Sequence, residues 1–200
     1  MRRTKEDMLV TRQQIIDAGF DCFFEKGYEA TSLVEVADRS GVTRGAIYWH
    51  FSNKLDLYHA VIDMVLQYGD VAQYFNELPV DMALEDRLNE IFRKSLGENR
   101  YVDFVFKTLA FTLGRSEFSD IYEQLSEAKR KLMQSFKLEV SVYVRMHSIQ
   151  NADEGMIATA LYLLFEGLFL TKNVPIGISI SRSEVERHIH LILSELRSTR

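Results

Sequence analysis

The sequence predicts an all-α protein in which a small helix-turn-helix module precedes a larger helical bundle. Apolar residues recur with the period of a helix along nearly the whole chain, and only two prolines interrupt them, Pro79 and Pro175. Strand signals are almost absent, since the one short alternation, residues 176–181, directly follows Pro175 and is predicted to be a loop. The first three predicted helices are short and closely spaced, and the later ones are long.

Helical periodicity and capping residues together predict the helix bounds. The predicted helices cover residues 9–26, 33–39, 43–51, 54–76, 82–97, 101–113, 118–147, 153–173 and 182–198. We expect a small N-terminal domain over residues 1–53 and a larger helical domain over residues 54–200.

Composition indicates an ordinary soluble protein. Of the 200 residues, 46% are hydrophobic and 26% are charged, which is enough apolar material for a real core. The single cysteine, Cys22, excludes an internal disulfide and a cysteine-based zinc site, and the basic N-terminus lacks the apolar run of a signal peptide. The most apolar run, residues 160–170, is too short to span a bilayer and contains Glu166 and Gly167. We therefore expect a cytoplasmic protein with no membrane contact, no cofactor and no metal.

The first three helices are justified by their stripes and caps. The first helix stops at Gly27 and carries an apolar stripe made of Ile15, Ile16, Gly19, Phe20, Phe23 and Phe24. Ser32 begins the second helix with Glu35 three residues later, which is the spacing of a capping box. The second helix ends at residues 40–42, and Thr43 can cap the third. Two helices joined by a short turn that contains glycine describe a helix-turn-helix.

The third helix separates into two faces at about 100° per residue. Its apolar side can pack against the first two helices, and its opposite side carries Arg44, Gly45, Tyr48 and Trp49. Arginine offers a planar donor fork for a guanine edge or a phosphate, glycine permits close backbone approach, and the two rings suit thymine methyls or sugars. The alternative is that Tyr48 and Trp49 pack under the fourth helix as core residues, which would leave Gly45 unexplained.

Two cations stand where an isolated helix would disfavour them. Arg44 lies in the first turn of the third helix and Lys54 in the first turn of the fourth, and helix N-termini are positive. A phosphate reverses this penalty, because free N–H groups, the helix dipole and the cation all face it. The basic N-terminal arm, Arg2, Arg3 and Lys5, could add backbone or minor-groove contacts or have no role. With a net charge of −5, the placement of the cations, not their number, indicates a nucleic-acid partner.

The string TSLVEVADRSGVTRGAIYWHFSNKLDLY, residues 31–58, closely resembles the DNA-binding domain of TetR-family repressors. Within it, TRGAIYWHF followed by Lys54 is similar to the AcrR-type branch that controls multidrug efflux pumps. The resemblance is specific over roughly residues 3–66, and beyond them it is one of helix pattern and length.

This resemblance implies a homodimeric repressor on double-stranded, near-palindromic operator DNA. Residues 1–53 would be the DNA-binding domain, and residues 54–200 would serve ligand binding and dimerisation. The resemblance implies that base edges are reached from the positions of Arg44, Gly45 and Tyr48. It implies that phosphates are held mostly at Thr43, Trp49, His50 and Lys54, and the predicted DNA-contacting set also includes Ser32.

A dimer through the last two helices, 153–173 and 182–198, is also implied, since the family builds a four-helix bundle from them. Residues 157–170 are apolar on most sides, as in a helix that is covered by its own domain and by a partner. Gly167 would permit close helix approach. An ordinary buried helix in a monomer would show the same pattern.

The resemblance further implies a cavity inside the bundle for a hydrophobic or aromatic small-molecule inducer. Aromatic residues at helical spacing are usually core, and from the apolar residues we select as lining candidates Met64, Phe92, Phe104, Phe111 and Phe136. Related regulators often place a carboxylate on the fourth helix to meet cationic drugs, whereas Leu66 and Gln67 stand near that place here. Glu166 is a substitute candidate, and it could equally form a buried hydrogen bond at the dimer interface.

These expectations combine into a repressor of a drug or amphiphile efflux operon that leaves its operator when a hydrophobic molecule binds. The ligand would favour recognition helices that no longer match successive major grooves, through a tilt of helix 54–76. No P-loop, GxGxxG, HExxH or GxSxG motif indicates an enzyme, and His59 and Asp63 lack a third metal ligand. The remaining alternative is a helical adaptor that binds only protein, which would explain exposed rings but not the placement of Arg44 and Lys54.

Overall fold

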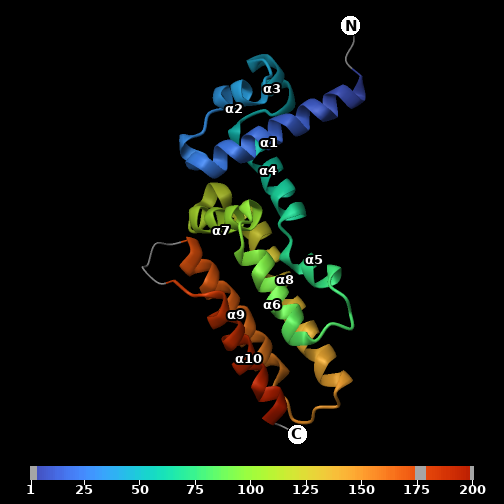
Figure 1. Cartoon of the computed structure of the whole chain (residues 1–200). Helices are drawn as coiled ribbons and strands as arrows, with labels where there is room; N and C mark the ends of the chain where they lie inside the picture. The colour runs from blue at the N-terminus through green and yellow to red at the C-terminus, as the bar shows by residue number, and fades with distance from the viewer. Residues whose placement is uncertain (1–3, 174–178, 199–200) are drawn as a thin grey trace. The chain divides into compact units, whose positions relative to one another are not determined.

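The computed structural model describes residues 4–173 and 179–198, and every regular element within these ranges is helical (Figure 1). The all-α fold class expected from the sequence is therefore confirmed. The chain divides into two compact units, Met1–Tyr68 and Gly69–Arg200. The basic arm at Arg2 and Arg3 and the start of the loop at Pro175 lie outside the described residues.

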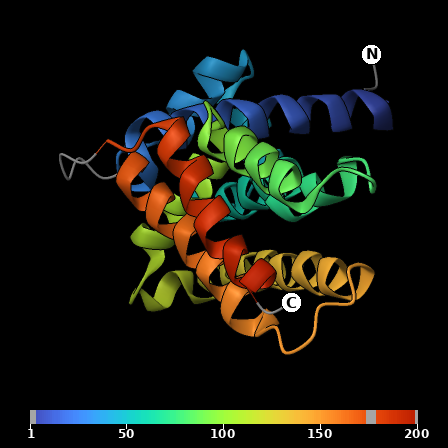
Figure 2. The same ribbon diagram turned by 60° about the horizontal axis from the view of Figure 1, so that its bottom comes forward.

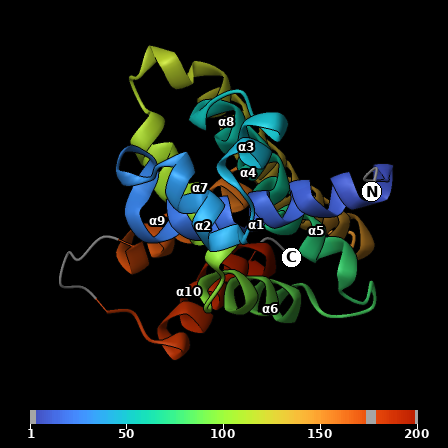
Figure 3. The same ribbon diagram turned by 90° about the horizontal axis from the view of Figure 1, so that it is seen from above.

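The first unit consists of α1 (Lys5–Ala30), α2 (Leu33–Ser40), α3 (Arg44–His50) and α4 (Lys54–Tyr68). α1 packs against both α2 and α4, and Figure 3 shows these helices from above. A Cβ added at Gly19 would lie 3.2 Å from Leu57 Cδ2, so this glycine lets α1 and α4 approach closely. The rings of Phe23, Tyr28 and Tyr58 fill the same interface, with Phe23 and Tyr58 edge to face at 4.9 Å.

Cys22 lies on the buried side of α1 as a small core side chain, as the sequence predicts. Burial raises the pKa of its thiol, although the nearby Arg39 guanidinium acts in the opposite direction. Arg39 donates two hydrogen bonds of 2.7 Å to the Glu25 carboxylate and thereby ties α2 to α1. The thiol is therefore protonated at neutral pH and shielded from solvent.

The turn between α2 and α3 has the geometry of a helix-turn-helix. Ser32 caps α2 by accepting a hydrogen bond from the Glu35 N–H at 3.2 Å, while the Glu35 side chain pairs with Lys26. Gly41 follows α2 with a φ of +70°, the left-handed conformation that favours glycine. Thr43 then caps α3 by accepting from the backbone N–H three residues later, at 3.2 Å. The caps at Ser32 and Thr43 and the glycine turn are confirmed, whereas the capping box predicted at Ser32 forms only in half, because the Glu35 carboxylate pairs with Lys26.

The second unit contains α5 (Val71–Glu77), α6 (Leu84–Leu96), α7 (Arg100–Thr112), the 3-10 helix η1 (Ser116–Phe118), α8 (Ser119–Met146), α9 (Glu154–Asn173) and α10 (Arg182–Ser198). α8 packs against α7 and α9, and α10 packs against α6 and α9. Figures 1 and 2 both show α9 beside α10. The rings of Phe92, Phe136 and Phe165 meet in the core, with centroids between 5.3 and 6.1 Å apart. Three helices that are distant in sequence thus share one apolar core.

Most observed helix bounds lie within a few residues of the predicted ones. α1 begins earlier than predicted because Thr4 and Asp7 form a capping box, and it leaves helical geometry at Gly27, where φ is +80°. The prediction of one helix over residues 54–76 is wrong. α4 ends at Tyr68 and α5 begins at Val71.

The break between α4 and α5 has a local cause. Gly69 adds backbone freedom, and the Asp70 side chain accepts a hydrogen bond from the Ala72 N–H at 2.9 Å, which starts a new helix. The break coincides with the boundary between the two compact units, so α4 packs with the first unit. The functional boundary expected at residue 54 falls inside that unit, and a role for α4 in ligand binding stays a prediction.

Arg87 on α6 is buried, and its guanidinium donates hydrogen bonds to several parts of the second unit. Its Nε and Nη2 donate to the two carboxylate oxygens of Glu139 on α8, each at 2.8 Å. Its Nη1 donates to the carbonyls of Leu78 and Pro79, and its Nη2 also donates to that of Phe75. One side chain therefore fixes the end of α5 and the following loop to both α6 and α8.

α9 is long and apolar enough to cross a membrane by length and composition alone. Its side chains Leu161, Phe165 and Leu168 are buried in the core of the second unit. The helix packs against α8 and α10, so its hydropathy is explained as that of a core helix.

Candidate nucleic-acid interface

α3 presents one buried side and one exposed side, as its helical pattern predicts. Ile47 is fully buried, whereas Tyr48 is 57% exposed and Trp49 is 67% exposed. The two rings are therefore not core residues, which removes the structural alternative for them. Two large aromatic side chains exposed together on one short helix are typical of a binding surface.

Arg44 and Gly45 are also exposed on α3. No acidic residue stands in the first turn of α3, so the guanidinium charge is not neutralised within that turn. A Cβ added at Gly45 would meet no heavy atom within 4 Å, which shows open space above the backbone. Glycine in an exposed helix costs about 1 kcal/mol relative to alanine, and close approach by a partner would account for it.

Lys54 has a structural role that the sequence did not indicate. Its ammonium donates to the carbonyls of Tyr28 at 2.8 Å, Thr31 at 3.0 Å and Glu29 at 3.2 Å, and it lies 4.3 Å from the centroid of the Tyr28 ring. These carbonyls close the C-terminal end of α1, whose last turn contains no basic residue. Lys54 supplies a charged donor to the carbonyls of the short turn that follows the kink at Gly27, and this role accounts for its position without a phosphate.

The first turn of α4 is also capped from within the protein. Asn53 Oδ1 accepts from the Asp56 N–H at 2.9 Å, and the Asp56 carboxylate accepts from the Ser52 N–H at 2.8 Å. A carboxylate at this place opposes an incoming phosphate. Lys54 therefore stabilises the junction between α1 and α4, and a contact from Lys54 to DNA stays a prediction.

The other polar candidates have roles in the fold as well. Ser32 and Thr43 use their hydroxyls as helix caps and are exposed. The His50 ring meets the Trp49 ring edge to face, with centroids 4.6 Å apart. Contacts from these residues to DNA remain predictions.

The apolar ligand candidates are divided between the two compact units. Met64 is buried within the first unit, whereas Phe92, Phe104, Phe111 and Phe136 belong to the second. Phe92 and Phe136 are core residues in mutual contact, and Phe104 is buried as well. Of the five, Phe92 lines the cavity described below, and the others do not.

Glu166 on α9 is half-buried and forms an ion pair with Lys129 on α8. The pKa of the neighbouring Tyr162 hydroxyl is raised, first by burial and then by the negative charge of Glu166 and a hydrogen bond to it. The carboxylate is therefore satisfied within one chain, without a drug cation or a second subunit.

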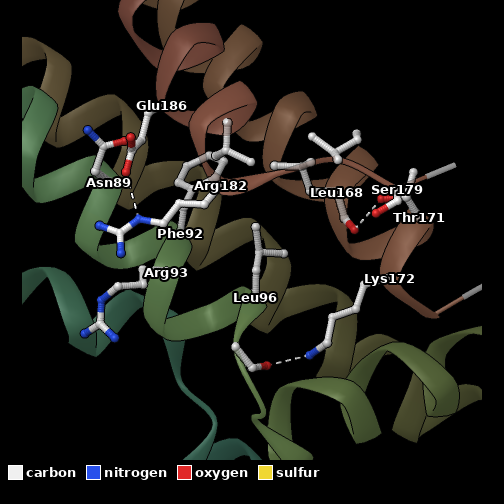
Figure 4. A pocket seen from close by; sticks show the side chains of 13 residues that line it. Asn89, Phe92, Arg93, Leu96, Leu168, Thr171, Lys172, Ser179, Arg182 and Glu186 are labelled. Atoms are coloured by element: carbon white, nitrogen blue, oxygen red, sulfur yellow. Dashed lines mark hydrogen bonds and ion pairs between the residues drawn. The ribbon is translucent and has the colours of Figure 1, made fainter.

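A cavity of about 410 Å³ lies between α6, α9 and α10 (Figure 4). Its apolar described residues are Phe92, Leu96, Leu168, Ile180 and Val185. Its polar and charged described residues include Asn89, Arg93, Lys172, Arg182 and Glu186. The sequence reasoning missed nearly all of them, because three helices bring them together.

Exposed apolar side chains form a stripe on α9. Met156, Leu163 and Leu170 are 55%, 61% and 45% exposed, and they recur every seven residues, so they lie along one side of the helix. Leu191 on the neighbouring α10 is 63% exposed. A stripe of this kind on a helix pair is suited to packing against another protein surface.

The fold of the first unit and the exposed α3 surface are those of a helix-turn-helix DNA-binding domain. Residues 15–61 match the family described as "Bacterial regulatory proteins, tetR family". The N-terminal region of the chain therefore carries a TetR-family DNA-binding domain, and this region is AcrR-like. The chain is 46% identical over 63 residues to the transcriptional regulator AcrR of Shigella flexneri, a match that covers 32% of this chain and 29% of that protein.

A longer match joins the chain to the transcriptional regulator TtgR of Pseudomonas putida. The two are 39% identical over 112 residues, which are 46% of this chain and 53% of TtgR. The chain thus spans about half the length of this curated relative. A solved structure of a SmeT–triclosan complex has the same fold, with a TM-score of 0.70 and 20% identity over 92% of this chain and 90% of that one. AcrR and TtgR are both named as helix-turn-helix transcriptional regulators.

Proposed function

We propose that the protein is a homodimeric repressor that binds a near-palindromic operator and controls a drug or amphiphile efflux operon in the cytoplasm. The observation that carries this proposal is the exposed surface of α3, on which Arg44, Gly45, Tyr48 and Trp49 stand together. The AcrR-like match over the helix-turn-helix supports an efflux operon, since the AcrR-type branch controls efflux pumps.

In this proposal α3 enters the major groove. The Arg44 fork binds both acceptors of a guanine edge or a phosphate, and Gly45 lets the backbone approach the DNA. Tyr48 and Trp49 place their rings against thymine methyls or sugars, and their polar hydrogens reach phosphates. The exposed fractions of both rings make this contact possible without unfolding any part of the unit.

Dimerisation through α9 and α10 sets the distance between two recognition helices. One helix-turn-helix reads only a few base pairs, so useful affinity needs two copies at half-sites about one DNA turn apart. The stripe of Met156, Leu163 and Leu170 supplies an apolar surface that a second α9 would cover. The exposed Leu191 extends that surface onto α10.

A hydrophobic small molecule bound in the second unit would release the operator by linkage. The ligand must bind more tightly to a conformation in which the two recognition helices no longer fit successive grooves. Because the chain breaks at residues 69–70, a displacement reaches α4 through a short junction and not along one rigid helix. The triclosan complex of the structural neighbour SmeT supports a hydrophobic effector.

Fluorescence anisotropy on duplex DNA from directly upstream of the gene tests this function. We expect binding that exceeds that of random duplex, weakens with salt, and loses about 1–3 kcal/mol in Arg44→Ala. A genome-wide selection that yields no preferred duplex would contradict the repressor and favour the protein-binding adaptor. Equal ligand affinity for free and operator-bound protein would contradict ligand-induced release.

A further inference from the structure

The cavity between α6, α9 and α10 favours a ligand of different charge from the cationic drugs considered above. We infer that it binds an amphipathic anion, a small molecule with an apolar body and a carboxylate or sulfonate head group. This inference rests on the proposed function in one respect, since it names the chemical class of the effector.

Apolar side chains form the floor of the cavity. Phe92, Leu168 and Val185 are almost fully buried, and Leu96 and Ile180 border them. The volume of about 410 Å³ falls in the usual range of ligand pockets, roughly 300–1,000 Å³. The floor therefore accepts a ring or a short alkyl chain.

Cations dominate the rim. Arg93, Lys172 and Arg182 line the cavity, and Glu186 is the one carboxylate among its described lining residues. Figure 4 shows Leu96 between Arg93 and Lys172, so cations flank the apolar floor from two sides. Among the lining residues alone, an anionic head group would meet three attractive charges and one repulsive charge, and a cationic head group would meet the reverse.

The ion pairs of these cations leave room for a ligand. The N···O distance is 2.8 Å in the pairs Arg182–Glu186 and Lys172–Asp103, and Arg93 is paired with Glu90. The Arg93 and Arg182 side chains are 52% and 74% exposed, and exposed ion pairs are weak because solvent screens them. A ligand anion can therefore share or replace the carboxylate partner of Arg93 or Arg182 with little loss. Lys172 is only 28% exposed and also donates to the Gly97 carbonyl at 2.6 Å, so it would share its charge with a ligand and keep its own partners.

Asn89 supplies an independent observation. Its side-chain oxygen is buried and has no hydrogen-bond partner among the described residues. The residue lines the cavity and lies beside Glu186 in Figure 4. A ligand hydroxyl or N–H group next to the head group would satisfy this oxygen. Anions that carry such a donor are expected to bind more tightly than those that lack it.

Glu166 does not reverse the charge of the cavity. Its carboxylate is paired with Lys129, and it is not among the lining residues. The group that the sequence offered to a cationic drug is thus already neutralised at another place.

The position of the cavity suits it to regulation. α9 and α10 contribute Leu168 and Val185 to the cavity, and they carry Leu163 and Leu191 on the proposed dimer surface. A ligand held between α6 and α10 would shift α10 and so change the geometry of the dimer. The recognition helices would move with it.

Isothermal titration calorimetry on the full-length protein tests the charge preference with two probes of equal chain length, decanoate and decyltrimethylammonium. We expect decanoate to bind about tenfold more tightly, since a tenfold change corresponds to about 1.4 kcal/mol. Lys172→Gln/Arg182→Gln should weaken decanoate binding about fivefold or more, on the same scale. Arg130→Gln, an exposed α8 substitution outside the lining, is the matched control and should have no effect.

Two further variants test the site itself. Ile180→Trp places a large ring at a residue that is 38% exposed, so the fold should survive while decanoate binding is lost. Asn89→Leu should remove any preference for 2-hydroxydecanoate over decanoate, because the unpaired oxygen is gone. Circular dichroism confirms that each variant is folded.

The outcomes distinguish a failure of the cavity proposal from a failure of the repressor function. Equal or tighter binding of decyltrimethylammonium, no binding of either probe, or decanoate binding that ignores both Ile180→Trp and the double substitution would overturn the inference. Operator binding is followed separately by anisotropy. Decanoate that binds without weakening operator binding supports the anion-binding cavity but contradicts ligand-induced release of the operator. Operator release by other compounds, with no binding of decanoate, supports ligand-induced release but contradicts the anion-binding cavity.

Discussion

Replacing Lys54 with methionine tests whether its ammonium stabilises the end of α1 or binds a DNA phosphate. The ammonium donates three hydrogen bonds of 2.8–3.2 Å to carbonyls at the end of α1. Hydrogen bonds to charged groups contribute about 1.5–3 kcal/mol each, and these three share one half-buried donor, so their effects do not add fully. We expect Lys54→Met to lower the free energy of unfolding by about 2–4 kcal/mol.

Two measurements read the two roles of Lys54 independently. Thermal unfolding followed by circular dichroism should show a decrease in Tm of about 5–15 °C, at about 2–4 °C per kcal/mol for a chain of this length. The salt dependence of operator binding reports phosphate contacts, at about 0.9 in slope per contact. A dimer that lost two contacts would lose about 1.8 from the slope of log K against log salt concentration. We expect Lys54→Met to leave this slope unchanged.

Arg44→Met is the matched control, since it removes an exposed cation from α3 without touching the junction between α1 and α4. It should reduce the slope by about 1–2 and leave Tm nearly unchanged. Anisotropy is measured well below the Tm of both variants, so that unfolding does not contribute. A Lys54→Met protein with normal Tm and a slope reduced by about 2 would refute the assignment of Lys54 to the helix junction.

Three further predictions follow from the second unit. Leu163→Glu should convert the proposed dimer to monomer in analytical ultracentrifugation, because it places a charge in the apolar stripe of α9; a dimer that persists would locate the interface elsewhere. Arg87→Met should destabilise the protein by about 3–5 kcal/mol in urea unfolding, since it leaves Glu139 and three carbonyls without their donor, and adding Glu139→Met should restore only part of the loss. Asn89→Leu should raise the free energy of unfolding by about 1 kcal/mol in the absence of ligand, and a loss instead would show that the amide oxygen is satisfied in solution.

Local signals made most of the fold predictable from the sequence. The start and end of α2 are indicated by Ser32 and Gly41, and the start of α3 by Thr43. Each acts on backbone groups within a few residues, and the structure confirms each of them. The same kind of signal was present at Gly69 and Asp70, a flexible residue followed by a good N-cap. Apolar periodicity continues across the break, which is why the single helix over 54–76 was predicted.

Contacts between distant residues were not predictable in the same way. Lys54 meets carbonyls that lie 23 to 26 residues earlier, and no spacing rule indicates such a pairing. The cavity depends on α6, α9 and α10 meeting. Its lining on α6 mixes apolar residues with the polar Asn89 and the charged Arg93, as an ordinary amphipathic surface helix does. The exposure of Tyr48 and Trp49 was predictable because it follows from one helix and its two faces.

The burial of Cys22 makes the protein well suited to spectroscopic labelling. Thiol reagents attack an accessible thiolate, and this thiol is enclosed and protonated. A cysteine introduced at the exposed Asp38 on α2 would therefore be the single reactive group on each chain. Spin labels attached there would report the separation of the two DNA-reading units in the proposed dimer directly, before and after an effector is added.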